Sequence, residues 1–281
     1  MDLGLAEHVV FVTGASGGIG RALAQAFAAE GARVVLAGRA RARELQDWVA
    51  QQDWRERALV VRADVREPAS LATAFSSAVD AFGRVDACIA NAGAWPTPEV
   101  PLHEVDERRI RETLDVNLLG ALWTARAFLA ALARTGPRAD GHGASLVFVG
   151  STAGRFGEAG HAEYATAKAG LVGLMRSLKN EIVRLDPFGR VNLVEPGWTV
   201  THMVRPALGQ PGTIAKVLAT MPVRQLGRAA DVAAAIAWLC SPLAARHVSG
   251  QTLTLAGGME GRQLWTDDEI DEAAVRLRAR E

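Results

Sequence analysis

The stretch "HVVFVTGASGGIGRALAQAFAAEGARVVLAGR", residues 8–39, contains the pattern from which the fold can be predicted. A mainly apolar run at 8–13 leads into a glycine-rich turn, a helical pattern covers 19–30, and a second apolar run follows at 32–37. A strand, a helix and a second strand in this order form a βαβ unit with parallel strands. Since both runs are nearly continuous in hydrophobicity, we expect the strands to be covered on both faces.

The same alternation continues through most of the chain. Further apolar runs lie at residues 58–63, 85–90, 144–150, 190–195 and 251–256. Further helical patterns lie at residues 68–82, 105–134, 162–186 and 229–240. Strands and helices in alternation imply right-handed crossovers and helix layers on the sheet. We therefore predict an α/β protein with a single doubly wound parallel sheet, Rossmann-like, with helices on both faces, within residues 1–258.

One long connection falls outside the alternation. Residues 196–228 carry four prolines and four glycines with scattered apolar residues. A long irregular connection inside a compact domain is usually functional. We expect this segment to be a substrate loop.

The tail, residues 259–281, is predicted to be helical. Thr266 and Glu269 have the spacing of a capping box, acidic residues fill the first turn, and arginines fill the last. A charged helix start explains the acidic residues, so we expect no metal site. One apolar stripe is predicted to dock on the body of the protein or on a neighbouring subunit; it consists of Ile270, Ala273, Ala274 and Leu277.

Composition excludes several classes of function. The formal net charge of the 281 residues is +0, which argues against a general affinity for nucleic acid or acidic membranes. No apolar run reaches the 18 residues that a membrane span requires. The two cysteines, Cys88 and Cys240, have no metal or redox spacing, and we interpret them as small buried side chains in a reducing compartment. We expect a cytoplasmic protein.

The glycine-rich turn after the first strand predicts a dinucleotide site. In "TGASGGIG", residues 13–20, Gly14 permits a tight turn, Gly18 permits close approach of a pyrophosphate, and Gly20 permits close helix–sheet packing. The helix that follows offers free N–H groups and partial positive charge to phosphates. The strand before and the helix after supply the context that the motif requires.

The end of the second strand bears on which dinucleotide binds. An NAD enzyme commonly has an acidic residue there, whereas this chain has Gly38 followed by Arg39. An arginine can pair with a 2′-phosphate, so we predict NADP, with NAD as the alternative. Another interpretation is that Arg39, Arg41 and Arg43 form only a solvated helix start. Gly17 weakens the NADP prediction slightly, because many NADP-dependent proteins have a second basic residue in the turn.

Tyr164 is the only tyrosine of the chain, and Lys168 follows it by four residues. Residues four apart on a helix share a face, so both side chains can reach one site. A free phenol has a pKa near 10, and a nearby ammonium favours the phenolate and lowers that value. We therefore expect the pKa of Tyr164 to be lowered, so that it acts as a general acid in reduction or a base in oxidation.

These features recur with others in a fixed order. The motifs are TGASGGIG at 13–20, ADV at 63–65, NAG at 91–93, DVNLLG at 115–120, Ser151 thirteen residues before Tyr164, YATAK at 164–168 and PGWTVT at 196–201. Over about residues 5–258 the chain resembles a classical short-chain dehydrogenase/reductase. The segment "ARTGPRADGHGA" at 133–144 and the tail at 259–281 make the chain longer than the usual pattern, and neither departure touches a motif.

The resemblance implies roles for the catalytic group, Asn117, Ser151, Tyr164 and Lys168. Ser151 would hold the substrate oxygen, Lys168 would hydrogen-bond the nicotinamide ribose, and Asn117 would support a water that relays protons to Lys168. Asp64 and Val65 would contact the adenine. With the glycine turn and Arg39 included, the predicted cofactor-binding residues are Gly14, Ser16, Gly18, Ile19, Gly20, Arg39, Asp64, Val65, Asn91, Ala92, Gly93, Tyr164, Lys168, Pro196, Gly197 and Thr201.

The predicted reaction is reduction of a ketone to a secondary alcohol, on a 3-oxoacyl thioester or a biosynthetic intermediate. The alternatives are an NAD-dependent secondary-alcohol dehydrogenase and a dinucleotide-sensing protein without chemistry; retention of all four catalytic residues argues against the latter. Four apolar side chains form either a substrate pocket or a core or subunit contact: Trp95, Phe156, Trp198 and Met203. His161 receives no catalytic role. A homo-oligomer, dimer or tetramer, is expected by resemblance.

Overall fold

A central parallel sheet organises the computed structural model, which describes residues 2–271 together with 275 and 278. The strand order is β3-β2-β1-β4-β5-β6-β9, and every pair in it is parallel. The strands of this sheet are β1 (Val9–Thr13), β2 (Arg33–Gly38), β3 (Ala58–Arg62), β4 (Ala87–Ala90), β5 (Ser145–Val149), β6 (Arg190–Pro196) and β9 (Thr252–Leu255). Each predicted strand is present within two residues of its predicted bounds.

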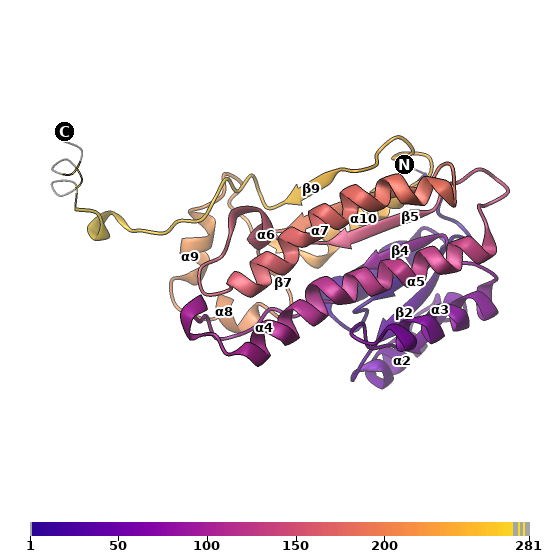
Figure 1. The fold of residues 1–281 in the computed structure, drawn as a ribbon, viewed down its shortest axis with the longest axis horizontal. Helices are drawn as coiled ribbons and strands as arrows, with labels where there is room; N and C mark the ends of the chain where they lie inside the picture. Colours follow the sequence, from indigo (N-terminus) through magenta and orange to yellow (C-terminus); the bar gives the residue numbers. More distant parts are fainter. Residues whose placement is uncertain (1, 272–274, 276–277, 279–281) are drawn as a thin grey trace.

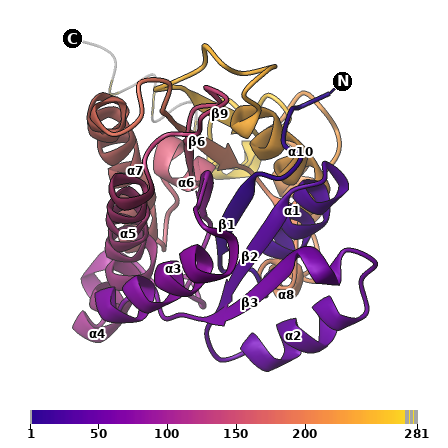
Figure 2. The same cartoon turned by 90° about the vertical axis from the view of Figure 1, so that its right-hand side faces the viewer.

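Helices cover both faces of the sheet, which confirms the predicted fold class (Figures 1 and 2). One face carries α3, α5 and α7, and the other carries α1, α2 and α10. The helices in the described residues are α1 (Gly18–Ala29), α2 (Ala42–Ala50), α3 (Pro68–Phe82), α4 (Glu107–Leu114), α5 (Gly120–Thr135), α6 (Thr152–Phe156), α7 (Ala162–Glu181), α8 (Arg205–Leu208), α9 (Thr213–Leu218) and α10 (Ala229–Cys240). The prediction misses α2 and the short helices α6, α8 and α9.

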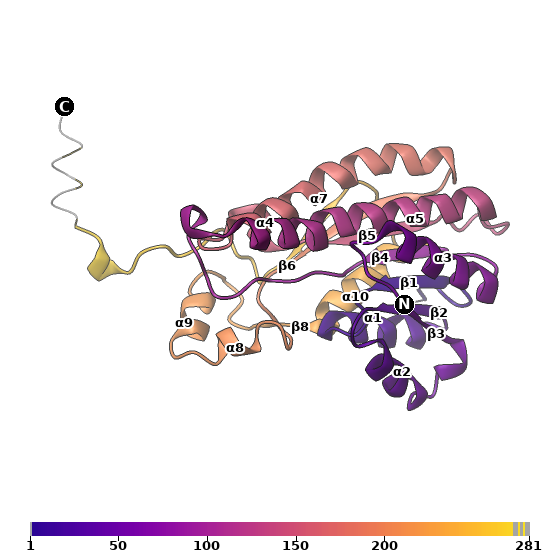
Figure 3. The ribbon, with the colours of Figure 1, turned by 60° about the horizontal axis from the view of Figure 1, so that its bottom comes forward.

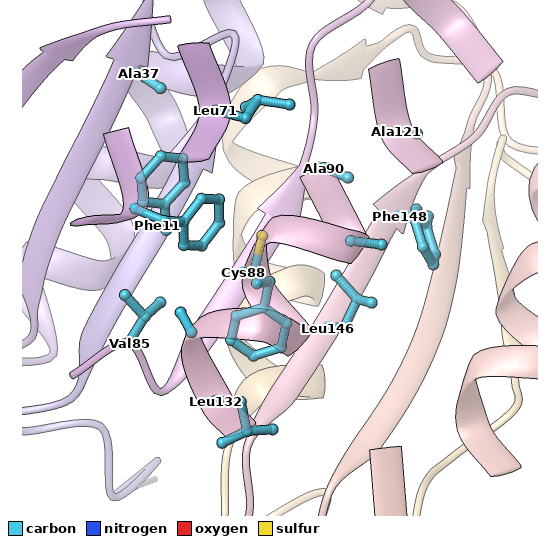
Figure 4. Close-up of a cluster of buried hydrophobic side chains, with 14 of the residues drawn as sticks. Phe11, Ala37, Leu71, Val85, Cys88, Ala90, Ala121, Leu132, Leu146 and Phe148 are labelled. Carbon is cyan, nitrogen blue, oxygen red and sulfur yellow. The ribbon is translucent and has the colours of Figure 1, made fainter. Parts of the chain in front are cut away.

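The core has two layers because the central strands bury both sets of side chains. On the α3–α5–α7 side, Phe11 of β1 stacks on Phe75 of α3, with ring centroids 4.0 Å apart, and Phe128 of α5 lies 6.4 Å from Phe75. Cys88 of β4 lies in this cluster between Phe11 and Leu146 (Figure 4). Both Cys88 and Cys240 are free and buried, as predicted.

The helical segment 107–135 departs from the expectation that no part of the chain is long and apolar enough to span a membrane. It is apolar enough over 18 residues, and long enough, to cross a membrane by length and composition alone. In the structure 44% of its most apolar window is buried. Phe128 and Leu132 of this segment lie in the core cluster beneath the sheet, so packing against the sheet accounts for its apolar character.

The connection at 196–228 folds over the carboxyl ends of the strands. It contains α8 and α9 and begins and ends in a small parallel pair, β7 (Thr199–Val200) with β8 (Gly227–Arg228). Beyond β9 the tail first passes α9 and then leaves the body of the protein (Figures 1 and 3).

Part of the predicted C-terminal helix falls in the described residues. The N–H of Thr266 donates to the Glu269 carboxylate at 2.8 Å, which is half of the predicted capping box, and Asp267–Glu269 form a 3₁₀ turn. Ile270 is 48% exposed. The other members of the predicted stripe, Ala273, Ala274 and Leu277, lie outside the described residues.

Candidate active site

A cavity of about 550 Å³ follows the carboxyl ends of the strands. Its floor is formed at β1, which pairs with β2 on one side and with β4 on the other. From β1 the chain runs outward to β3 and then continues from β4 in the opposite direction, so the connections on the two sides of β1 diverge. Ligands of open α/β sheets bind at such a crevice. Every predicted site residue except Asn117 lines this one cavity.

The glycine turn forms the end of the cavity nearest α1. Gly14 has a φ of 65°, which favours glycine. A Cβ atom on Gly20 would lie 2.4 Å from the Gly14 carbonyl oxygen, so a side chain there would displace the turn. Helix α1 begins at Gly18 with no side-chain cap and no acidic residue in its first turn. Its first N–H groups are therefore left for an anion, and the residues present fit a cofactor pyrophosphate.

The basic residues after β2 lie further along the same wall. Arg39 and Arg41 both line the cavity, and no acidic residue ends β2. The Arg39 guanidinium lies 3.8 Å from the Asp64 carboxylate, which also forms an ion pair with Arg66. The hydrogen bond from Arg66 is the main reason that the pKa of Asp64 falls below its ordinary value. Asp64 therefore stays charged and holds Arg39 at the cavity wall.

The end of β4 is fixed by two asparagines. Asn91 donates to the Thr13 carbonyl at 2.9 Å and so ties the ends of β4 and β1 together. Asn117 lies in a π-turn between α4 and α5, and it is fully buried. Its side chain accepts from the Ala94 N–H at 3.1 Å and donates to the Ala94 carbonyl at 2.9 Å. Asn117 thus shapes the cavity wall from behind, and its predicted role in a proton relay stays a prediction.

Ser151, Tyr164 and Lys168 meet at the centre of the cavity. Ser151 lies two residues beyond the end of β5 and caps α6, accepting from the Ala153 N–H at 3.1 Å. The Ser151 hydroxyl acts on the Tyr164 hydroxyl and lowers its pKa. Lys168, one turn along α7, donates to the Val149 carbonyl at 2.9 Å, and its ammonium lies 5.7 Å from the centre of the Tyr164 ring. The predicted spacing therefore brings the two side chains to one site.

The pKa of Tyr164 contradicts the expectation from the sequence. Burial of the phenol raises its pKa to about 12, and the Ser151 hydroxyl opposes this shift only in part. The Glu158 carboxylate raises the pKa of Tyr164 further, and the Arg262 guanidinium lowers it. Burial also lowers the pKa of Lys168 to about 8. Desolvation is the largest cause of the shift at Tyr164, so the phenol keeps its proton at neutral pH.

Two charged residues that line the cavity, Glu158 and Arg262, were not predicted from the sequence. Glu158 lies in the loop before α7, where burial raises the pKa of its carboxyl and the Arg262 guanidinium lowers it. Arg262 lies beyond β9, in the tail. Its position has no signal in the sequence, because it belongs to no motif. The position of Glu158 gives a weak signal in the sequence. It lies six residues before Tyr164, in the loop that leads into α7.

The predicted apolar pocket is formed in part. Trp95, Trp198 and Met203 line the cavity. Phe156 instead packs against a small buried cluster beneath the 196–228 segment. The Trp95 side chain lowers the pKa of the Glu158 carboxyl, and its ring stacks on that of His161 with the centroids 4.6 Å apart. His161 itself is fully buried and bonds the Pro96 carbonyl at 2.9 Å, which is a structural role.

Comparisons with known proteins agree with this arrangement. A family model described as enoyl-(acyl carrier protein) reductase matches residues 14–260. The chain is 38% identical over 262 residues to the cis-4-hydroxycyclohexanecarboxylate dehydrogenase of Sinomonas cyclohexanicum, covering 92% of this chain and 98% of that protein.

Two solved structures share the fold at a TM-score of 0.79. One is a short-chain dehydrogenase from Burkholderia cenocepacia in complex with NADP, at 32% identity, covering 90% of this chain and 98% of that one. The other is a 3-ketoacyl-(acyl-carrier-protein) reductase from Brucella melitensis with NADH, at 27% identity and the same coverage. With the fold, the glycine turn and the Ser–Tyr–Lys cluster, these matches show that the chain is an oxidoreductase of the short-chain dehydrogenase/reductase family.

Proposed function

We propose that the protein is an NADP(H)-dependent oxidoreductase that reduces a ketone to a secondary alcohol, with Tyr164 as the general acid. One observation carries the proposal. A half-buried phenol, Tyr164, lies with Ser151 and Lys168 in a cavity that begins at a glycine turn with free helix N–H groups. A pKa of about 12 keeps the proton on Tyr164 at neutral pH, as donation to a reduced oxygen requires.

The residues of the chain divide the work along the cavity. The turn at 14–20 would hold the pyrophosphate, and Arg39 with Arg41 would hold the 2′-phosphate. When bound, the reduced nicotinamide supplies the hydride. Ser151 donates a hydrogen bond to the substrate oxygen, and the Tyr164 hydroxyl transfers its proton to that oxygen as the alcohol forms. Lys168, a cation beside this phenol, stabilises the negative charge left on Tyr164.

The substrate is proposed from the shape of the far end of the cavity and from the relatives. Trp95 and Trp198 give this end an apolar wall, with their rings in an edge-to-face contact at 6.1 Å. A cyclic or branched ketone fits such a wall. The relatives named above include a dehydrogenase of a ring hydroxy acid and a 3-ketoacyl reductase. Both act on a secondary alcohol or its ketone.

The alternative is an NAD-dependent dehydrogenase that oxidises a secondary alcohol. The complex of a solved relative with NADH supports it, and so does the ion pair of Arg39 with Asp64, which engages the guanidinium that would bind a 2′-phosphate. We further propose a cytoplasmic homo-oligomer. Free, buried cysteines support a reducing compartment, and the exposed side chains of Leu119 and Val183 along the α5 and α7 side support a subunit contact.

The decisive experiment measures oxidation of NADPH and of NADH by the purified protein with a panel of ketones. The panel includes 4-oxocyclohexanecarboxylate, cyclohexanone and a short 3-oxoacyl thioester. We expect turnover with at least one ketone and a preference for NADPH. A preference for NADH would favour the alternative. Turnover that persists in Tyr164→Phe would show that another group supplies the proton.

A further inference from the structure

The tail brings a cation into the active-site cavity. Met259, just after β9, is 5% exposed and lies in a buried cluster with Val217 and Met221 of the 196–228 segment. Arg262 follows three residues later and lines the cavity. The buried Met259 therefore fixes the start of the tail, so that Arg262 is held at the substrate end.

Only some of the N–H groups of the Arg262 guanidinium donate hydrogen bonds to other described residues of the protein. Its Nε–H donates to the Gly157 carbonyl at 3.2 Å and its Nη2 to the Thr152 hydroxyl at 3.2 Å. Its Nη1 makes a weaker contact of 3.7 Å with the Met259 sulfur. A guanidinium has five N–H donors, so one N–H on each terminal nitrogen has no partner in residues 2–271. Within the same residues it forms no ion pair.

The surroundings place this cation close to the reacting group. Thr152, to which Arg262 donates, is the neighbour of Ser151 and also lines the cavity. The charge of Arg262 lowers the pKa of the Tyr164 hydroxyl and of the Glu158 carboxyl. Glu158 is the one carboxylate at this end of the cavity among the described residues. The Trp95 side chain also lowers the pKa of the Glu158 carboxyl, so this carboxylate has a second neighbour besides Arg262.

Building on the proposed function, we propose that Arg262 binds a carboxylate of the substrate, so that the protein acts on oxo acids and the matching hydroxy acids. The two free N–H groups, one on each terminal nitrogen, are the donors that a carboxylate pairs with in a bidentate bond. Because Arg262 reaches Thr152, beside Ser151, the carboxylate lies only a few bonds from the carbon that is reduced. A tail-fixing role explains the bonds to Gly157 and Thr152, but it explains neither the free donors nor their place in the cavity.

The test compares an oxo acid with its methyl ester, which has the same shape and no charge. The ratio of kcat/KM for 5-oxohexanoate to that for methyl 5-oxohexanoate is measured in wild type and in Arg262→Gln. We expect wild type to favour the acid and the ratio to fall about 30-fold or more in the variant, since a desolvated charge pair is lost. Arg262→Lys keeps the charge without the bidentate geometry, so its acid-to-ester ratio should lie between those of wild type and Arg262→Gln.

Arg155→Gln is the matched control. Arg155 lies on α6 near the same loop, pairs with Glu195 at 3.7 Å and does not line the cavity. Its variant should keep the wild-type ratio. A wild type that does not prefer the acid, or an acid-to-ester ratio that Arg262→Gln leaves unchanged, would overturn the assignment.

A binding measurement separates this inference from the proposed reaction. Trp95 and Trp198 line the cavity, so their fluorescence reports binding of 5-oxohexanoate without turnover. If wild type reduces no carbonyl, the proposed function fails, and the fluorescence titration still decides the role of Arg262. Weaker binding of the acid, but not of the ester, in Arg262→Gln supports a carboxylate site; equal binding of the acid in both proteins refutes it.

Discussion

Replacement of Lys168 by methionine should change how stability depends on pH, because this ammonium is buried. Lys168 is 5% exposed, and burial lowers its pKa from 10.5 to about 8. Below pH 8 the folded protein must hold the charge in the interior, whereas the unfolded chain holds it in water. Between pH 8 and 10.5 the folded protein has lost the proton and the unfolded chain still binds it, so this lysine destabilises less as pH rises.

The size of the effect follows from the two pKa values. From pH 7 to pH 10 the free energy of unfolding of wild type should rise by about 2.5 kcal/mol relative to Lys168→Met. The bond from the Lys168 amine to the Val149 carbonyl is already part of the folded-state pKa, so its change from a charged to a neutral donor is not counted separately.

Urea unfolding of both proteins at pH 7 and pH 10, without cofactor, measures this difference. Lys216→Met is the matched control, since it removes an exposed ammonium on α9 and leaves the buried one in place. A stability difference between wild type and Lys168→Met that does not change with pH would refute the claim that burial controls this lysine. The active site would then lack the buried cation on which the proposed chemistry depends.

Four further substitutions test the site and the core. Tyr164→Phe should lower turnover by about 10²–10⁴-fold in the NADPH assay, since it removes the proton donor, while a cofactor titration shows nearly unchanged affinity. Arg39→Ala should weaken binding of NADPH and leave that of NADH unaltered; equal effects on both would exclude a 2′-phosphate contact. Gly20→Ala places a Cβ atom 2.4 Å from the Gly14 carbonyl, so cofactor affinity should fall and unfolding should become easier by about 1–3 kcal/mol. Phe128→Ala should cost about 3–5 kcal/mol in urea unfolding, because the ring is fully buried against Phe75; a smaller loss would mean that the core closes around the gap.

The sheet and the centre of the site follow from local patterns. The runs at 8–13 and 32–37 became β1 and β2 because an apolar strand between two helix layers needs no long-range information to be recognised. The turn at 14–20 requires glycine for reasons of its own backbone, and the four-residue spacing of Tyr164 and Lys168 fixes their common face. Helix α2 was missed although Leu45 and Val49, four residues apart, give it a buried face, because at nine residues it is shorter than the patterns recognised in the sequence.

The properties of the site depend on partners that are distant in the chain. The sequence by itself determined which strands alternate with which helices, where a glycine turn leads into the first helix and which phenol shares a helix face with which ammonium. Only the tertiary structure decided that Tyr164 has a raised pKa, that Asn117 bonds Ala94, and that Arg262 from the tail lines the cavity beside Glu158. The reason is physical: helix spacing and turn geometry depend on neighbouring residues, whereas desolvation and electrostatic interactions depend on whatever the complete fold brings within a few ångströms.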